Sequence, residues 1–325
     1  MRRALYLVAG LVVVVVVAFA GVIAFDAPSR PPPLASISNP FAAVDFSDLP
    51  PPREYRARDG TGLTYRAYPS KGEQIVVLIH GSSGSSADMH PLAKALRDAD
   101  ASVYVPDLRG HAGLGRSGDV DYVGQLEDDL ADLVVPLRQA HPHTGVTLIG
   151  FSSGGGFVLR VIGSTAANLF DRFVMVSPAL PPGSPTIRPQ TGGWVSVALP
   201  RAVALAILTR VGIDRFDGLP IVGFATPPQV QGLTSFYSFR MAVDFAAPRD
   251  YLARLARSTK PAVVLIGGAD ELFFPDRFAP LLQTARPDMR VTIVPDTGHI
   301  GMTVSPAGIA AIRKAYLDLI APAAG

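Results

Sequence analysis

The sequence predicts a doubly wound α/β domain, in which a mostly parallel sheet carries helices on both faces. Two observations support this prediction. Short runs of apolar, β-branched residues recur along the chain without polar alternation, which is typical of strands buried on both faces. Stretches of helical character separate these runs, so that strand and helix alternate. A chain of 325 residues is long enough to bury such a core.

The chain begins with an uncharged run of 22 residues at positions 4–25. As a helix this run would extend about 33 Å, enough to cross the core of a bilayer. Arg2 and Arg3 precede the run and Asp26 follows it, so we expect a transmembrane helix that leaves the N-terminus in the cytoplasm. The alternative is a signal peptide cleaved after Ala18-Phe19-Ala20, which would yield a secreted protein.

Eight prolines follow between residues 27 and 52. Proline disfavours regular hydrogen-bonded structure, so we expect a semi-rigid, extended spacer here. The chain thus divides into an N-terminal transmembrane anchor or signal segment (1–26), a proline-rich linker (27–52) and a folded domain (53–325).

The folded domain is expected to open with a β-hairpin, because alternating segments at 54–58 and 63–68 flank a glycine-containing turn. Further strands are expected at the apolar runs 75–80, 102–107, 146–150, 173–177, 262–267 and 291–295. Helices are expected at 88–98, 121–140, 153–164, 250–258, 276–285 and 306–320.

One long interval, from about residue 178 to 260, interrupts the alternation of strand and helix. It holds an apolar stretch at 202–213, and its aromatic residues include Trp194, Phe236, Tyr237 and Phe239. An insertion of this length is usually functional or disordered, and this one is too apolar to be disordered. We expect a helical cap over the ends of the strands.

A G-x-S-x-G motif, Gly150 to Gly154, lies between a predicted strand and a predicted helix. A sharp turn in this context requires small residues beside the nucleophile and exposes the serine hydroxyl above the sheet. Ser152 is therefore the candidate nucleophile. A glycine-rich turn without chemistry is the alternative, and a phosphate-binding loop fits worse because no Lys-Ser/Thr pair follows the glycines.

A serine hydroxyl is a weak nucleophile until a base, oriented by a carboxylate, takes its proton. His299 follows the last predicted strand and Asp270 follows the strand before it, at the edge where an open α/β sheet binds its ligands. The order Ser152, Asp270, His299 is the order of nucleophile, acid and base on this type of sheet. The competing carboxylates are Glu271, Asp276 and Asp296.

The oxyanion of a tetrahedral intermediate needs two backbone N–H groups. We expect one from Ser153, directly after the nucleophile, and one from Ser82 in the loop after the strand at 75–80. His80, at the end of that strand, is expected to order the loop by hydrogen bonding rather than to act as a base.

Taken together, these residues resemble the α/β-hydrolases of the serine aminopeptidase and monoglyceride-lipase-like (lysophospholipase) branch. His80-Gly81 resembles the oxyanion motif of that family, and Gly298 to Met302 resembles its histidine loop. Asp107 to His111 resembles its D-x-R-G-H-G-x-S signature, with a slightly expanded continuation. The resemblance covers about residues 54–320 but does not extend to the cap.

Composition excludes several classes of function. The chain has no cysteine, which rules out thiolate metal sites and a cysteine nucleophile, and we expect neither a metal nor another cofactor. The net charge of +2 falls to zero without Arg2 and Arg3, so no nucleic acid partner is expected.

The resemblance and the triad predict a serine hydrolase that cleaves carboxylic esters through an acyl-enzyme. The apolar cap favours a lipid-like substrate, such as a monoacylglycerol or a lysophospholipid. A peptidase or amidase of the same fold is the alternative, and a non-catalytic binding module is a further one. The domain is expected on the extracytoplasmic side, anchored in the membrane or secreted after cleavage.

Overall fold

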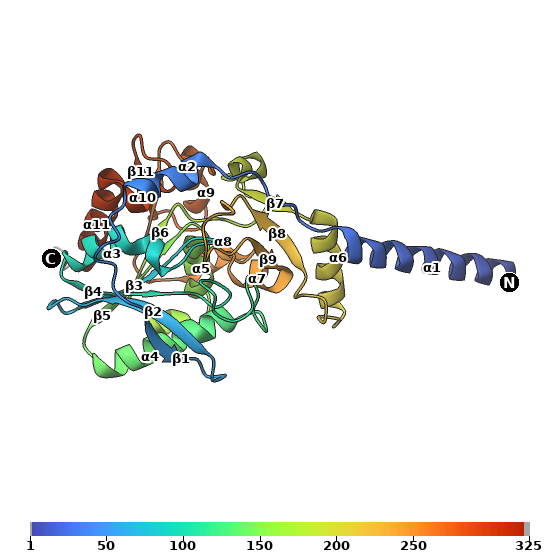
Figure 1. The fold of residues 1–325 in the computed structure, drawn as a ribbon, viewed down its shortest axis with the longest axis horizontal. Coiled ribbons are helices and arrows are strands. Elements are labelled where there is room, and N and C mark those ends of the chain that lie inside the picture. Colours follow the sequence, from blue (N-terminus) through green and yellow to red (C-terminus); the bar gives the residue numbers. More distant parts are fainter. Residues whose placement is uncertain (1, 322–325) are drawn as a thin grey trace.

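The computed structural model describes residues 2–321, apart from the side chains of residues 2–5, 7–9, 11, 12, 15 and 16. Its central sheet is formed by β1 (Arg53–Arg56), β2 (Gly62–Tyr68), β3 (Gln74–Ile79), β4 (Ala101–Pro106), β5 (Gly145–Phe151), β6 (Arg172–Val176), β10 (Ala262–Gly267) and β11 (Arg290–Val294). The order across the sheet is β1-β2-β4-β3-β5-β6-β10-β11 (Figure 1). β1 and β2 run antiparallel to their neighbours, and the other strands are parallel to one another.

Helices cover both faces of this sheet, as predicted. One face packs against α4 (Gln125–Ala140), α5 (Ser153–Ile162), α8 (Tyr251–Arg257) and α9 (Phe278–Leu282). The other packs against α3 (His90–Arg97), α10 (Gly301–Val304) and α11 (Pro306–Ile320). Short 3-10 helices are η2 (Ser86–Met89), η3 (Thr165–Leu169), η4 (Pro189–Gly193) and η5 (Pro275–Arg277).

The strand β3 shows why a strand of this sheet lacks polar residues over most of its length, here from Ile75 to Ile79. Successive side chains of a strand point to opposite faces of the sheet. Val77 therefore packs into the cluster under α4 and α5, whereas Val76 and Leu78 pack into the cluster under α3 and α11. The predicted hairpin and the predicted parallel strands are all present. The last helix before β11 is shorter than expected, because residues 275–277 form η5 and residues 283–285 form a turn.

The cap between residues 178 and 260 is not the purely helical element that the sequence predicted. It contains a three-stranded antiparallel sheet of β7 (Val195–Val197), β8 (Pro220–Phe224) and β9 (Phe236–Ser238). α6 (Leu199–Arg210) and α7 (Phe239–Asp244) lie beside it. The helical prediction was right for most of the apolar stretch at 202–213, which lies in α6, but it missed the three strands, because periodicity cannot distinguish a short apolar strand from a turn of buried helix.

The helix α1 (Arg2–Phe25) projects from the domain (Figure 1). At its C-terminal end, Val22 and Ile23 belong to the same apolar cluster as Ala204 and Leu205 of α6. Among the residues that the structure describes, no helix is long and apolar enough to cross a membrane. The transmembrane anchor expected at residues 4–25 therefore has no support from the structure, although several side chains of this run lie outside the part that the structure describes.

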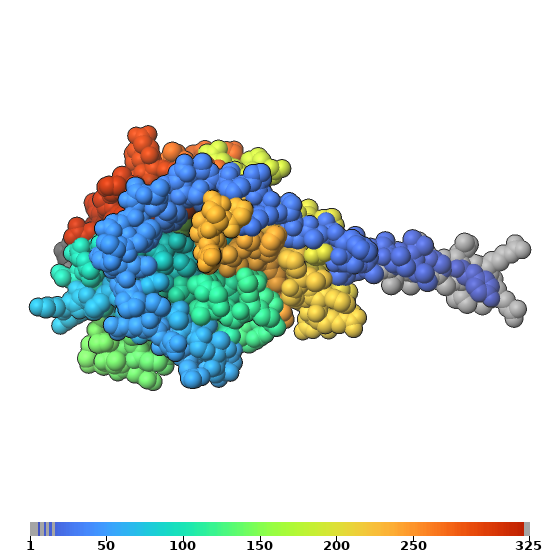
Figure 2. Space-filling model, in the orientation of Figure 1, coloured from blue at the N-terminus to red at the C-terminus, as the bar shows by residue number. Residues whose placement is uncertain are grey.

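Residues 27–52, which we call the N-terminal strap, run as a band across the surface of the domain (Figure 2). They include α2 (Ala35–Ser38) and the 3-10 helix η1 (Asn39–Ala43). Arg30 hydrogen-bonds Thr226, and the carboxylate of Asp48 lies 2.6 Å from Nζ of Lys94. The prediction that this segment is a spacer is therefore wrong, because the segment is docked on the domain. Proline removes backbone donors within the segment, but it does not prevent side chains from docking on the domain.

Candidate active site

Ser152 lies at a sharp turn between β5 and α5. Its backbone angles are φ 55° and ψ −119°, which a residue other than glycine rarely adopts and which strain the turn. The two glycines of the motif allow neighbouring backbone to approach closely. A Cβ at Gly154 would lie 2.5 Å from the carbonyl oxygen of His80, and a Cβ at Gly150 would lie 2.2 Å from that of Gly154. The motif therefore forms the sharp turn with small flanking residues that the sequence predicted.

The three residues predicted as a triad lie in hydrogen-bonding contact. Nε2 of His299 is 2.9 Å from Oγ of Ser152, and Nδ1 of His299 is 2.8 Å from Oδ2 of Asp270. All three side chains are buried. An ionised Asp270 favours the proton of the neutral ring on Nδ1, which leaves Nε2 free to accept a proton from Ser152.

Asp270 is held as a carboxylate by several donors. Its Oδ1 accepts hydrogen bonds from the backbone N–H groups of Leu272 at 2.9 Å and Phe273 at 3.0 Å. Burial acts to raise its pKa, but the attraction of His299 and these hydrogen bonds outweigh burial, and the net pKa lies below the usual value. Asp270 is therefore ionised and fixed in orientation.

The competing carboxylates occupy other positions. Asp296 is exposed on the loop that precedes His299. Glu271 is closer, but its Oε2 accepts a hydrogen bond from the backbone N–H of His299 at 2.9 Å and has no bond to the imidazole ring. Glu271 thus positions the histidine loop, a role that the sequence analysis did not anticipate.

The two segments that carry the candidate oxyanion donors lie beside the nucleophile. Ser153 is the first residue of α5, so its N–H belongs to the positive end of that helix. A Cβ at Gly81 would lie 3.2 Å from Cβ of Ser152, which places the loop after β3 directly beside the serine. Nε1 of Trp194, in the cap, donates to Oγ of Ser82 at 3.1 Å and ties this loop to the cap.

The sequence matches the family described as Serine aminopeptidase, S33, over residues 70–302. The chain belongs to this family of α/β-hydrolases. An uncharacterised protein of Mycobacterium tuberculosis (strain ATCC 25618 / H37Rv) is 26% identical over 84% of this chain and 83% of its own length. The sn-1-specific diacylglycerol lipase ABHD11 of Danio rerio is 26% identical over 49% of this chain and 50% of its own length.

Solved structures show the same fold at low identity. A soluble variant of monoglyceride lipase from Saccharomyces cerevisiae, in complex with a substrate analogue, superposes with a TM-score of 0.63 at 17% identity. The match covers 83% of this chain and 94% of that one. A monoacylglycerol lipase from Paleococcus ferrophilus gives a TM-score of 0.59 at 20% identity, covering 79% and 97%.

His80 orders the loop after β3 of this hydrolase, as the sequence analysis expected. Its Nδ1 lies 2.7 Å from the carbonyl oxygen of Gly81, and its Nε2 accepts from the backbone N–H of Leu108 at 3.3 Å. One nitrogen donates and the other accepts, which is the pattern of a neutral imidazole. His80 is therefore a positioning residue.

A second buried histidine, His111, supports the same loop, a role that the sequence analysis did not anticipate. Nε2 of His111 lies 2.5 Å from the hydroxyl of Tyr237 in β9, which accepts from the backbone N–H of Ser83 at 2.9 Å. This chain of hydrogen bonds joins the D-x-R-G-H segment, the cap and the loop after β3. Because that loop carries the candidate donor Ser82, we call it the oxyanion loop. Tyr237 is 126 residues from His111, so no local pattern could reveal the contact.

The two buried histidines, His80 and His111, are expected to reduce the folding stability of the hydrolase as the pH falls below about 6.5. Burial lowers the pKa of His111 from 6.5 to about 3, and it also lowers the pKa of His80. Between these values the unfolded chain binds protons that the folded protein does not. Each such histidine then lowers the free energy of unfolding by up to about 1.4 kcal/mol for every pH unit.

Four carboxyls whose pKa is raised by burial, Asp88, Asp129, Asp217 and Asp244, oppose this trend, so the test compares variants. Burial raises the pKa of Asp88 and Asp244 to about 6, and their protonation favours the folded state at low pH. In urea unfolding from pH 7.5 to 5, the slope of the free energy of unfolding against pH should differ between His111→Gln and the unaltered protein by close to one proton, because the variant lacks the loss of stability that His111 causes as the pH falls. Equal slopes in the two proteins would contradict a neutral, buried His111.

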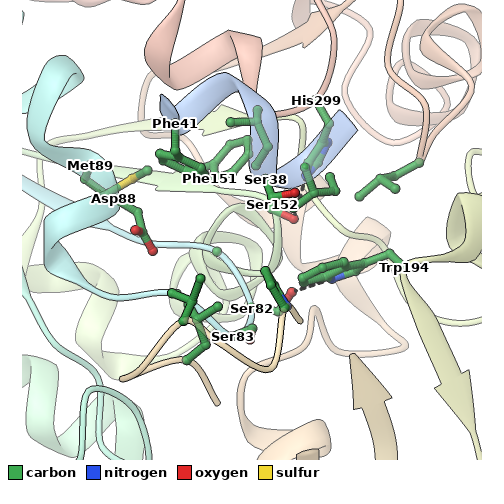
Figure 3. Close-up of a pocket in the computed structure, with 18 of the residues that line it drawn as sticks. Ser38, Phe41, Ser82, Ser83, Asp88, Met89, Phe151, Ser152, Trp194 and His299 are labelled. Atoms are coloured by element: carbon green, nitrogen blue, oxygen red, sulfur yellow. Dashed lines mark hydrogen bonds between the residues drawn. The ribbon is translucent and has the colours of Figure 1, made fainter. Parts of the chain in front are cut away.

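The catalytic candidates open into a cavity of about 290 Å³ (Figure 3). Ser152 and His299 line it, with Phe151 and Met89 among the apolar side chains around them. The cap contributes Trp194, Pro227, Val230 and Leu233. Trp194 thus lies in the wall of the cavity at the ends of the strands, where the cap was expected. Phe236, part of the aromatic group singled out in the sequence, is not among the lining residues and is partly exposed.

Proposed function

We propose that this protein is a serine hydrolase that cleaves carboxylic esters carrying an apolar chain, with Ser152 as the nucleophile. The observation that carries the proposal is the hydrogen-bonded series Ser152, His299, Asp270 at the wall of an apolar cavity. Such a series converts a hydroxyl into a nucleophile.

The reaction would follow from this geometry. Oγ of Ser152 attacks the ester carbonyl carbon while its proton passes to Nε2 of His299, and Asp270 stabilises the imidazolium that forms. The backbone N–H groups of Ser82 and Ser153 bind the oxyanion of the tetrahedral intermediate. His299 then gives its proton to the leaving alkoxide, which releases the alcohol. Water, deprotonated by His299, hydrolyses the acyl-enzyme and restores Ser152.

The cavity supports a lipid-like ester, such as a monoacylglycerol or a lysophospholipid. Its walls are mostly apolar, and burial of a hydrocarbon chain there is favourable. The relatives described as monoglyceride, monoacylglycerol and diacylglycerol lipases are consistent with this class of substrate.

A peptidase is the second candidate, because the description of the family names a serine aminopeptidase. The two candidates differ in the bond they cleave. An ester hydrolase should release p-nitrophenol from p-nitrophenyl butanoate and show little release of p-nitroaniline from aminoacyl anilides. The reverse order of rates would favour the peptidase, and a protein inert to both and to a fluorophosphonate probe would favour a binding module.

We expect kcat/KM on p-nitrophenyl esters to rise with acyl length until the cavity is filled. Each methylene buried in an apolar site contributes about 0.8 kcal/mol, or roughly fourfold in rate. Trp194→Gln should flatten this rise and leave hydrolysis of the acetyl ester much less changed. Phe236→Gln, outside the cavity, is the matched control and should leave the profile as it is. A flat profile from acetyl to dodecanoyl in the unaltered protein would contradict the lipid-like substrate.

We also propose that residues 1–26 tether the domain to a membrane and place it on the extracytoplasmic side. This part rests on the sequence, namely the uncharged run between Arg3 and Asp26. Secretion after cleavage of the segment is the alternative.

The full chain is expected to sediment with membranes and to remain there at high salt. A protein that begins at Ala27 should stay in the supernatant and keep its activity, because it retains the strap. Sedimentation followed by an esterase assay measures both. A mature protein whose N-terminal sequence starts at Gly21 would show cleavage and would contradict the tether.

A further inference from the structure

The middle of the N-terminal strap crosses the cavity that holds Ser152. The strap residues that line this cavity are Ile37, Ser38, Phe41 and Phe46. In Figure 3, Phe41 lies on the Met89 side of Ser152, and Trp194 of the cap lies on the opposite side. One wall of the cavity is therefore built by a segment outside both the sheet and the cap.

The N-terminal end of the strap is bound to the cap. Nε and Nη2 of Arg30 donate to Oγ1 of Thr226 at 3.1 and 2.7 Å. The hydroxyls of Ser29 and Ser196 lie 2.8 Å apart. The carbonyl oxygen of Ser29 would lie 2.1 Å from a Cβ at Gly223, so the strap rests directly on β8.

The other end of the strap is fastened to α3 and β2. The carboxylate of Asp48 lies 3.0 Å from Nε2 of His90 and 2.6 Å from Nζ of Lys94. The ring of Phe46 stacks on His90, with 6.0 Å between the ring centroids. Arg66 of β2 donates to the carbonyl oxygen of Pro50. Both ends of the crossing segment are thus held.

Apolar packing places the segment between these two ends. Leu34 and Ile37 pack, partly buried, against the large cluster under α4 and α5, which also contains Trp194. Phe41 packs against the cluster under α3 and α11, which contains Phe151 and Met89. The side chains of Ile37 and Phe41 are therefore positioned by the domain while one surface of each faces the cavity.

We propose that Ile37 and Phe41 contact the apolar chain of the substrate and determine the chain length that the enzyme accepts. The proposal rests on the ester hydrolase function proposed above. Neither side chain contributes to the sheet, the triad or the oxyanion loop, so a change in its size alters the cavity without altering those elements. A smaller residue at position 41 lengthens the apolar cavity, and a larger one shortens it.

The test compares Phe41→Ala and Phe41→Trp with Val44→Ala, a strap variant outside the cavity. For each protein, the active sites are titrated with a fluorophosphonate, and kcat/KM is measured on p-nitrophenyl butanoate and dodecanoate. Two further buried methylenes correspond to roughly a fifteenfold gain. The ratio of dodecanoate to butanoate should therefore rise about fifteenfold in Phe41→Ala, fall by a similar factor in Phe41→Trp, and stay constant in Val44→Ala.

The outcomes separate this proposal from the function on which it rests. An unaltered protein that does not react with the fluorophosphonate would contradict the proposed function. If both Phe41 variants react normally with the fluorophosphonate but have the same ratio of dodecanoate to butanoate as the unaltered protein, the proposed role of the strap is overturned. If the strap only stabilised the fold, the Phe41 variants would have a lower melting temperature. Their rates on the two esters would fall by the same factor, so the ratio would not change.

Discussion

Replacing Ser152 by alanine is expected to lower kcat on p-nitrophenyl butanoate by about 10⁴-fold or more and to abolish labelling by a fluorophosphonate. Without Oγ, His299 has no hydroxyl to deprotonate, and no acyl-enzyme can form. The oxyanion donors would remain, since they are backbone groups, but alone they leave only a small part of the rate enhancement.

The matched control is Ser153→Ala. This substitution removes a neighbouring hydroxyl and keeps the backbone N–H that the oxyanion requires, so kcat should change little. Both variants should unfold within a few degrees of the unaltered protein, because each loses a single hydroxyl and no apolar packing. Ser152→Ala protein that is pure, folded and retains more than a few per cent of the activity would rule out Ser152 as the nucleophile.

Replacing Asp270 by asparagine is expected to lower kcat by about 10⁴-fold. Asparagine has the same shape and its oxygen can still accept from Leu272 and Phe273, so the loop should keep its structure. Its amide group, however, can donate to Nδ1 of His299, which favours the tautomer protonated on Nε2. In that tautomer the ring cannot accept the proton of Ser152.

Two neighbouring carboxyls provide the controls for Asp270. Asp296→Asn changes an exposed residue at a positive φ of 51°, which asparagine tolerates, and should leave kcat nearly unaltered. Glu271→Gln keeps an oxygen that can accept from the backbone of His299, so its loss should be modest. An active Asp270→Asn beside an inactive Asp296→Asn would assign the acid to Asp296. Steady-state kinetics at pH 8 with purified variants would measure all three.

The sequence predicted the sheet well because the relevant signal is local. A strand buried on both faces must be apolar at nearly every position, and this holds for five consecutive residues of β3 and six of β10. The turn at Ser152 is also encoded locally, because Gly150 and Gly154 are required by the close approach of the backbone around them. The ends of β10 and β11 then placed Asp270 and His299 at the same edge as Ser152.

Tertiary structure alone decided how the strap, the cap and the oxyanion loop are held together. The hydrogen bonds from Arg30 to Thr226 and from Tyr237 to His111 join residues 196 and 126 positions apart. The prolines of the strap indicated an extended backbone, but they carried no information about where that backbone would dock. Periodicity reports the environment of one segment, whereas such contacts depend on how distant segments pack against each other. The sequence by itself therefore determined the sheet, the serine turn and the order of the three polar residues, and the packing of remote segments determined the walls of the cavity.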